Sequence, residues 1–243
     1  MRVVNGIAME HELYKRGQME WALWKAFALT SMSKAADMPQ TFRTRIKRLL
    51  EIDRTLKLEG SDAVSGTVHA FAPPPDEESG ETLYQSMDAF CLSVGLELLN
   101  AGFKQSEVVF LIRHLRTPFE KRFEDILNGP SLISRKNYCA KDYPGYPTYK
   151  GERQDLADGR VYVIIRTVEM TEVYPKLAGV QHPIVLEPVF CRGIDALSKD
   201  LHALTPYHGR IATILEIASS AQAVASFLKQ APAIKRGRPA KQT

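Results

Sequence analysis

Apolar residues recur at helical spacing in the first quarter of the chain, where they predict two neighbouring helices. Residues 20–32 have one apolar side, formed by Leu23, Trp24, Phe27 and Ala28. Pro39 suits the first turn of a second helix, because it has no backbone donor to leave unpaired. The apolar side chains of that helix fall within about 100° of arc. They are Phe42, Ile46, Leu49 and Leu50.

Between residues 60 and 85 the pattern becomes that of a hairpin, or wing. Residues 66–71 and 81–86 are typical of two short strands, and the prolines and acids of 72–80 predict a loop between them. The two strands are expected to pair with each other, directly after the second helix.

Three more helices are predicted before residue 130. The first covers 84–100, and Gly102 supplies the positive φ of a helix C-cap. The second covers 105–115, and a short third one runs from Pro118 to Leu127. Asn128-Gly129-Pro130 is a strong stop signal and marks a domain boundary.

The second half predicts a small α+β domain. Residues 131–158 are rich in Tyr, Pro, Gly and charge, so they are expected to form an irregular connection. Strands are predicted at 161–170 and 182–190, helices at 193–204 and 219–231, and either a strand or a helix at 211–218. The serines before the last helix can cap it. The fold class is therefore α+β, with domains at 1–129 and 131–230 and a flexible tail at 231–243.

Composition predicts a globular, intracellular protein. An apolar content of 44% is enough to bury a core, and there is neither an apolar run of membrane length nor a secretory signal. We expect a cytosolic protein with no membrane partner. Cys91, Cys139 and Cys191 are odd in number, far apart and not in pairs, so the sequence indicates neither a disulfide framework nor a four-ligand zinc site, and they are expected to be reduced thiols. A metal site assembled only in three dimensions is the alternative.

Positive charge gathers in two places on this chain. The last fifteen residues hold five basic residues and no acid, which exceeds the net charge of +4 of the whole chain. A second surplus lies between Pro39 and Leu58. Two local basic patches on a near-neutral body indicate two contacts with a polyanion.

The helix that starts at Pro39 has the layout of a recognition helix, with one apolar and one basic face. Such a helix enters the major groove, whose base edges match amide, hydroxyl, guanidinium and ammonium groups. Arg43 and Arg45, at the flanks, are expected to contact phosphates. The expected base readers are Gln40, Thr44, Lys47 and Arg48. The alternative is an ordinary amphipathic helix with a solvated charged face.

The order of helix, hairpin and the helical segment AFCLSVGLELLNAGFKQSEVVFLIRHLR resembles the MerR family of winged-helix regulators over residues 20–116. The resemblance implies a winged helix-turn-helix DNA-binding domain. In the family pattern an Arg in the recognition helix is followed by paired tyrosines, whereas this chain has Phe42-Arg43-Thr44-Arg45. The family's long antiparallel dimer helix is also absent from the prediction, because Pro118 and Asn128-Gly129-Pro130 limit the helix at its position.

The tail is similar to an AT-hook, whose core is Arg-Gly-Arg-Pro. Gly237 has no side chain to keep the backbone out of a narrow groove, and arginines extend along the groove floor on both sides. Narrow A·T-rich minor grooves concentrate negative potential, which favours inserted arginine. The residues of this motif are Lys235, Arg236, Gly237, Arg238 and Pro239. The alternative is a solvated basic terminus.

No catalytic motif is present: the chain lacks a Walker loop, a dinucleotide glycine fingerprint, a nucleophile elbow and a His-Glu-x-x-His pair. Arg113-His114-Leu115-Arg116 is interpreted as a helix C-terminus, where cations meet the dipole favourably. Asp88, Glu97 and Glu107 are expected on solvent-facing helix positions. The tyrosines of 131–158 are expected to pack that connection onto the domain surface, with stacking on bases or a ligand as the alternative.

Together these observations predict a non-enzymatic regulator or nucleoid-associated factor that binds A·T-rich double-stranded DNA, without a cofactor or a metal. The second domain would sense a small molecule, bind a protein partner or form a homodimer, and the residues do not choose among these. The alternative from another class is a protein-interaction adaptor without sequence-specific DNA binding. An enzyme whose site forms only in three dimensions is a third interpretation.

Overall fold

The structure is a computed structural model, and the elements that it describes leave several gaps along the chain. The described residues are 12–31, 37–56, 69–75, 80–130, 132, 159–168, 184–185, 188–203 and 212–233. The predicted connection at 131–158 lies outside them apart from Leu132, as do the AT-hook-like residues of the tail.

The two N-terminal helices form where the periodicity predicts them. They are α1 (Arg16–Ser31) and α2 (Gln40–Thr55). Pro39 is the N-cap residue, one position before the predicted first turn, and its carbonyl accepts from the amide of Phe42 at 3.1 Å. The buried positions of α2 are Ile46, Leu49, Leu50 and Asp53, while Phe42 is half-buried. The predicted apolar arc of α2 is thus confirmed, and it includes one carboxylate.

The next two helices, α3 (Ser86–Asn100) and α4 (Gln105–Leu127), meet at Gly102, whose φ of 99° ends α3 as predicted. The prediction of two helices at 105–115 and 118–127 was wrong, because α4 is one helix of 23 residues that continues through Pro118. An interior proline costs about 3 kcal/mol, whereas burying one phenylalanine contributes about 1.5–3 kcal/mol. Phe119 and Phe123 both follow Pro118 and pack on Phe90, with ring centroids 5.3 Å away in each case. This packing offsets the lost hydrogen bond.

The predicted wing does not form among the described residues. The strand β2 (Leu83–Tyr84) instead pairs antiparallel with β1 (Tyr14–Lys15), the two residues that precede α1 in the chain. Tyr14 lies opposite Tyr84. Residues 69–75 form no strand, because the amides of residues 70–72 donate to the carboxylate of Asp53. A backbone whose donors are used in this way is not available for a ladder with 83–84.

An antiparallel sheet centred on one strand makes up the second half. Its strands are β3 (Val161–Val168), β4 (Ile184–Val185), β5 (Val189–Arg192) and β6 (Ala212–Glu216). β3 pairs with β6 along one edge and with β4 and β5 along the other. The strand predicted at 182–190 is therefore present as two pieces, and the undecided segment 211–218 contains a strand.

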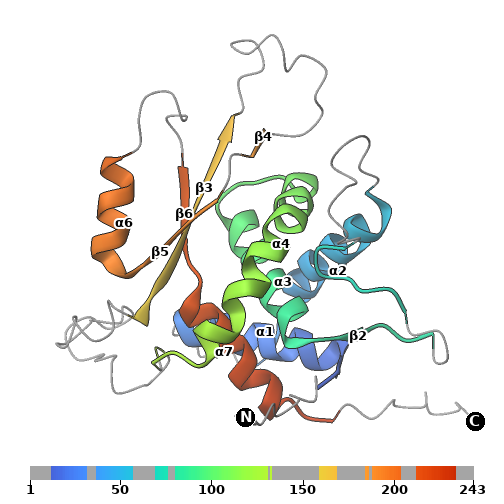
Figure 1. The fold of residues 1–243 in the computed structure, drawn as a ribbon. Coiled ribbons are helices and arrows are strands. Elements are labelled where there is room, and N and C mark those ends of the chain that lie inside the picture. Colours follow the sequence, from blue (N-terminus) through green and yellow to red (C-terminus); the bar gives the residue numbers. More distant parts are fainter. Residues whose placement is uncertain are drawn as a thin grey trace, which may run out of the picture.

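The sheet lies between two helical layers (Figure 1). Val161, Val163 and Ile165 face the bundle of α1 to α4 and α7 (Ala218–Gln230). Tyr162 and Ile164 point to the other face, where α6 (Gly193–His202) covers them. This alternation is the period of two expected of a strand that is buried on both faces.

The main core draws on both sides of the predicted domain boundary. Helix α7 packs on α1, α3 and α4, and Trp21 meets Phe227 edge-on with ring centroids 6.2 Å apart. The hydroxyls of Ser93 and Ser220 are 2.9 Å apart. The serines do not cap α7 as predicted: the carboxylate of Glu216 accepts from the amides that open the helix. Helix α7 therefore completes the N-terminal bundle.

No helix in the described ranges has the length and apolar character needed to cross a membrane. Within those ranges, no three His, Cys, Asp or Glu side chains are grouped so that they could hold a metal ion. Cys91 and Cys191 are free, buried thiols, as predicted, and burial raises the pKa of each to about 12. Cys139 lies outside the described residues.

Candidate nucleic-acid interface

The side of α2 that faces away from the core is cationic. Because the apolar arc of the helix is turned inward, its basic side chains project into solvent. We call this surface the basic face; its cations, all exposed, are Arg43, Arg45, Lys47, Arg48 and Arg54. Of the predicted base readers, Gln40 is also exposed and Thr44 is half-buried.

The charge of the basic face is only weakly compensated. Glu51 is its one acid, and its carboxylate lies 3.5 Å from the ammonium of Lys47, with both side chains more than half exposed. Such an i,i+4 pair contributes about 0.3–0.5 kcal/mol. Asp53, the other acid of α2, is 2% exposed and faces the core. The face therefore presents more positive than negative charge to any partner.

Two polar contacts restrict side chains on this surface. The Thr44 hydroxyl donates to the backbone carbonyl of Gln40 at 2.9 Å, so its hydrogen is already used and its oxygen remains an acceptor. The Arg54 guanidinium donates to the Thr82 hydroxyl at 3.0 Å, which ties the end of α2 to the segment before β2.

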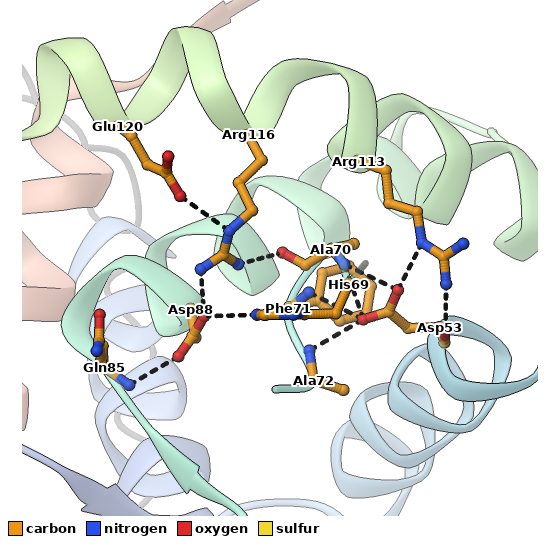
Figure 2. Close-up of polar contacts among 10 residues, drawn as sticks. All are labelled: Asp53, His69, Ala70, Phe71, Ala72, Gln85, Asp88, Arg113, Arg116 and Glu120. Carbon is orange, nitrogen blue, oxygen red and sulfur yellow. Dashed lines mark hydrogen bonds and ion pairs between the residues drawn. The ribbon is translucent and has the colours of Figure 1, made fainter. Parts of the chain in front are cut away.

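Behind the basic face, Asp53 anchors α2 to the rest of the bundle (Figure 2). Its carboxylate accepts hydrogen bonds from the amides of Ala70, Phe71 and Ala72 at 2.8 to 3.0 Å. It also accepts from Nε of Arg113, on α4, at 3.0 Å. Four donors on one buried carboxylate satisfy its lone pairs, which is the condition under which a buried charge is tolerated.

Arg113 spans the end of α2 with the rest of its guanidinium. One terminal nitrogen donates to the carbonyl of Leu56 at 3.0 Å, and the other donates to the carbonyl of Asp53 itself. The arginine thus closes the helix C-terminus, where free carbonyls carry partial negative charge. Helices α2 and α4 are joined by charge as well as by apolar packing.

Arg116, one turn further along α4, makes the equivalent connection to α3. Its guanidinium contacts Asp88 at 2.7 Å, the carbonyl of Ala70 at 2.7 Å and Glu120 at 3.1 Å. Burial raises the pKa of Asp88, but the hydrogen bond from His69 and the charge of Arg116 outweigh it and bring the pKa below its usual value. We call the buried set Asp53, Asp88, Arg113 and Arg116 the charge network.

The charge network corrects two sequence-based interpretations. Arg113 and Arg116 were interpreted as cations at a helix C-terminus, yet both lie within α4 and are almost fully buried, because its helix does not end at residue 117. Asp88 was expected to face solvent and is 2% exposed. Glu107 accepts from the amide of Lys104, at the start of α4.

Sequence signals for this network exist in the apolar patterns. Asp53 occupies an apolar position of α2, three residues after Leu50. Arg113 likewise lies among the buried apolar residues of α4, directly after Ile112. A charge inside an apolar stripe predicts a buried partner of opposite sign, although it does not identify that partner.

The other predicted contacts with DNA fall outside the described residues. Helix α7 ends at Gln230, and the tail motif Lys235, Arg236, Gly237, Arg238 and Pro239 follows after the last described residue, Ala233. The structure therefore places the residues predicted on α2 together and leaves the tail motif unplaced. The tyrosines of 131–158 also fall outside.

Comparisons of the chain with protein-family models, with curated proteins and with solved structures find no match. The similarity to MerR regulators and to the AT-hook therefore stays a prediction. Arguments about function depend on the geometry and charge of the described residues.

Proposed function

We propose that the protein binds double-stranded DNA through the basic face of α2 and acts as a transcriptional regulator or nucleoid-associated factor. The observation that carries this proposal is an exposed helix face with five cations and one acid, fixed from behind by the buried ion pair of Asp53 with Arg113. A solvated charged face needs no such anchoring, whereas a helix that reads a groove must keep its orientation.

In this proposal α2 lies in the major groove, whose width of about 12 Å admits a helix. Lys47 and Arg48, near the middle of the exposed side, donate to base edges. Arg43 and Arg45 lie on the two flanks and contact phosphates on either side of the groove. Gln40 and the acceptor oxygen of Thr44 complete the reading surface.

The tail motif adds a second contact in the minor groove. Its two arginines flank a glycine, and this chemistry suits a narrow A·T-rich groove. One such motif binds weakly alone, so its contribution is avidity for a duplex that α2 already holds. This half of the proposal depends on the sequence of residues 235–239.

The test is duplex affinity, measured by fluorescence anisotropy across a salt series with A·T-rich and G·C-rich probes. The double substitution Lys47→Ala/Arg48→Ala should weaken binding at least about tenfold and flatten the salt dependence, because counterions are released at each neutralised phosphate. Truncation before Lys235 should reduce the A·T preference. The folded chain should remain intact in both cases, since all the altered α2 side chains are exposed.

The matched control is Lys121→Ala/Lys199→Ala, which removes two exposed cations from α4 and α6. It changes the net charge equally but leaves the basic face intact, so duplex affinity should change little. Equal losses in the two double variants would mean that only net charge matters. Absence of duplex binding at moderate salt would contradict the proposal and favour a protein-interaction adaptor.

A further inference from the structure

A pocket of about 340 Å³ opens between α1, α2 and α3, next to the basic face. Its apolar lining consists of Trp24 and Phe27 from α1, Phe42 from α2 and Leu96 from α3. The ring of Phe42 meets the two others edge-on, with centroids 5.4 and 5.8 Å away. The volume falls at the lower end of the range of about 300–1,000 Å³ that is typical of small-molecule sites.

The polar side chains of the pocket carry both signs of charge. Arg45 projects from α2, and Glu97 and Asn100 project from the last turn of α3. Arg45 forms no ion pair with any acid in the described part of the chain. Partial desolvation of its carboxyl and the charge of Glu216 raise the pKa of Glu97, so the surroundings of that carboxyl favour a cation or a hydrogen-bond donor.

We propose that this pocket binds a small aromatic zwitterion of the α-amino-acid class. The aromatic group lies against Trp24, Phe27 and Phe42, the carboxylate binds Arg45, and the ammonium group binds Glu97. A purely apolar ligand would leave Arg45 and Glu97 desolvated without a partner, and a ligand with one charge would satisfy only one of them. Among ligands of this size, the zwitterion alone complements all three parts of the pocket.

The proposed ligand would also affect DNA binding, a consequence that rests on the proposed function. Arg45 belongs both to the pocket and to the basic face, so a ligand carboxylate competes with a DNA phosphate for the same guanidinium. Ligand binding therefore weakens DNA binding, and by thermodynamic reciprocity DNA weakens ligand binding. The ligand acts as an effector at the point where α2 contacts the duplex.

The binding test uses the full chain, with L-phenylalanine as the probe and no DNA present. Its readout is the indole N–H resonance of Trp24 in nitrogen-15 NMR spectra, with that of Trp21, which packs on Phe227 instead, as the internal reference. The matched control ligands are 3-phenylpropionate, which lacks the ammonium group, and 2-phenylethylamine, which lacks the carboxylate. For a ligand of this size we expect a Kd of about 1 mM or below.

L-phenylalanine should bind about tenfold more tightly than either control ligand. Arg45→Gln should abolish the preference over 2-phenylethylamine, and Glu97→Gln the preference over 3-phenylpropionate. Both side chains are exposed, so both variants should retain the fold, which circular dichroism checks. The proposal is overturned if L-phenylalanine gives no saturable shift up to about 10 mM, or if either control ligand binds as tightly.

The coupling test repeats the anisotropy titration with saturating L-phenylalanine. Adding L-phenylalanine should lower the duplex affinity of the natural chain several-fold. It should not change the duplex affinity of Arg45→Gln, because that variant has no guanidinium charge for the ligand to neutralise. Duplex binding that ignores the ligand overturns the effector role. If L-phenylalanine binds as described but no duplex binds at any salt concentration, the proposed function fails and the pocket assignment stands.

Discussion

Two arginines of α4, Arg113 and Arg116, use the guanidinium group in the opposite way to the arginines on the basic face of α2. Arg113 and Arg116 have side chains that are 9% and 8% exposed, and each contacts a buried aspartate at 3.0 Å or less. Arg43, Arg45 and Arg48 on α2 are exposed. The charges of Arg113 and Arg116 are therefore neutralised within the fold, whereas those of Arg43, Arg45 and Arg48 remain available to a partner.

This difference shows that a count of basic residues does not locate a binding surface. A buried ion pair costs several kcal/mol to break by removing one partner, because an uncompensated charge remains inside. An exposed pair contributes about 0–1 kcal/mol. Substitutions in the two regions should therefore separate stability from binding.

The largest expected effect is that of Asp53→Ala. The substitution leaves the Arg113 guanidinium buried without its carboxylate and the amides of residues 70–72 without their acceptor. We expect the free energy of unfolding to fall by about 3–5 kcal/mol. Urea denaturation followed by circular dichroism measures it.

Arg113→Met is the matched variant for this prediction. It keeps the volume and the stem of the side chain, and Asp53 retains its three amide donors. The loss should therefore be smaller than for Asp53→Ala. A larger loss for Arg113→Met would show that closing the carbonyls at the end of α2 matters more than satisfying the carboxylate.

The exposed half of this comparison could be predicted from the sequence. Helical periodicity assigns an inward and an outward face to α2 without any tertiary information, and both faces agree with the structure. The same is true of β3, whose β-branched run indicates a strand buried on both sides.

The buried charge network could not be predicted from the sequence, because its partners are far apart along the chain. Asp53 and Arg113 are separated by 60 positions, and periodicity says nothing about which charge meets which. The strand at 81–86 was predicted and contains β2, but its partner β1 was not, because a two-residue strand at 14–15 has no pattern to detect. The predicted break at Pro118 followed from its low helix propensity alone, whereas the packing of Phe119 and Phe123 on Phe90 keeps α4 continuous.

A smaller effect, with a defined pH dependence, is expected at Asp88. Its pKa is lower in the folded protein than the value of about 3.9 for an unfolded chain. Asp88 therefore contributes stability above that value and loses it as the pH falls from about 5 towards the folded pKa. Asp88→Asn should cost about 1.5–3 kcal/mol at neutral pH, and less as the solution becomes acidic.

Denaturation at pH 7 and near pH 3 measures this change. Arg48→Ala serves as the control, since it removes an exposed cation and should stay within about 0.5 kcal/mol of the natural chain. A cost for Asp88→Asn that is the same at both pH values would mean that the contact with Arg116 works as a neutral hydrogen bond and not as an ion pair.

The smallest effect on stability, and the sharpest contrast with the charge network, is expected for Glu51→Gln. It removes the only acid of the basic face and the i,i+4 pair with Lys47, so stability should fall by about 0.3–0.5 kcal/mol. Duplex affinity should instead rise a few-fold, because a like charge no longer repels the phosphates. Glu124→Gln, on the exposed side of α4, removes the same charge away from α2. If both substitutions raise the duplex affinity equally, long-range net charge attracts the duplex and the basic face does not. The contrast between the two sets of arginines would then not extend to DNA binding.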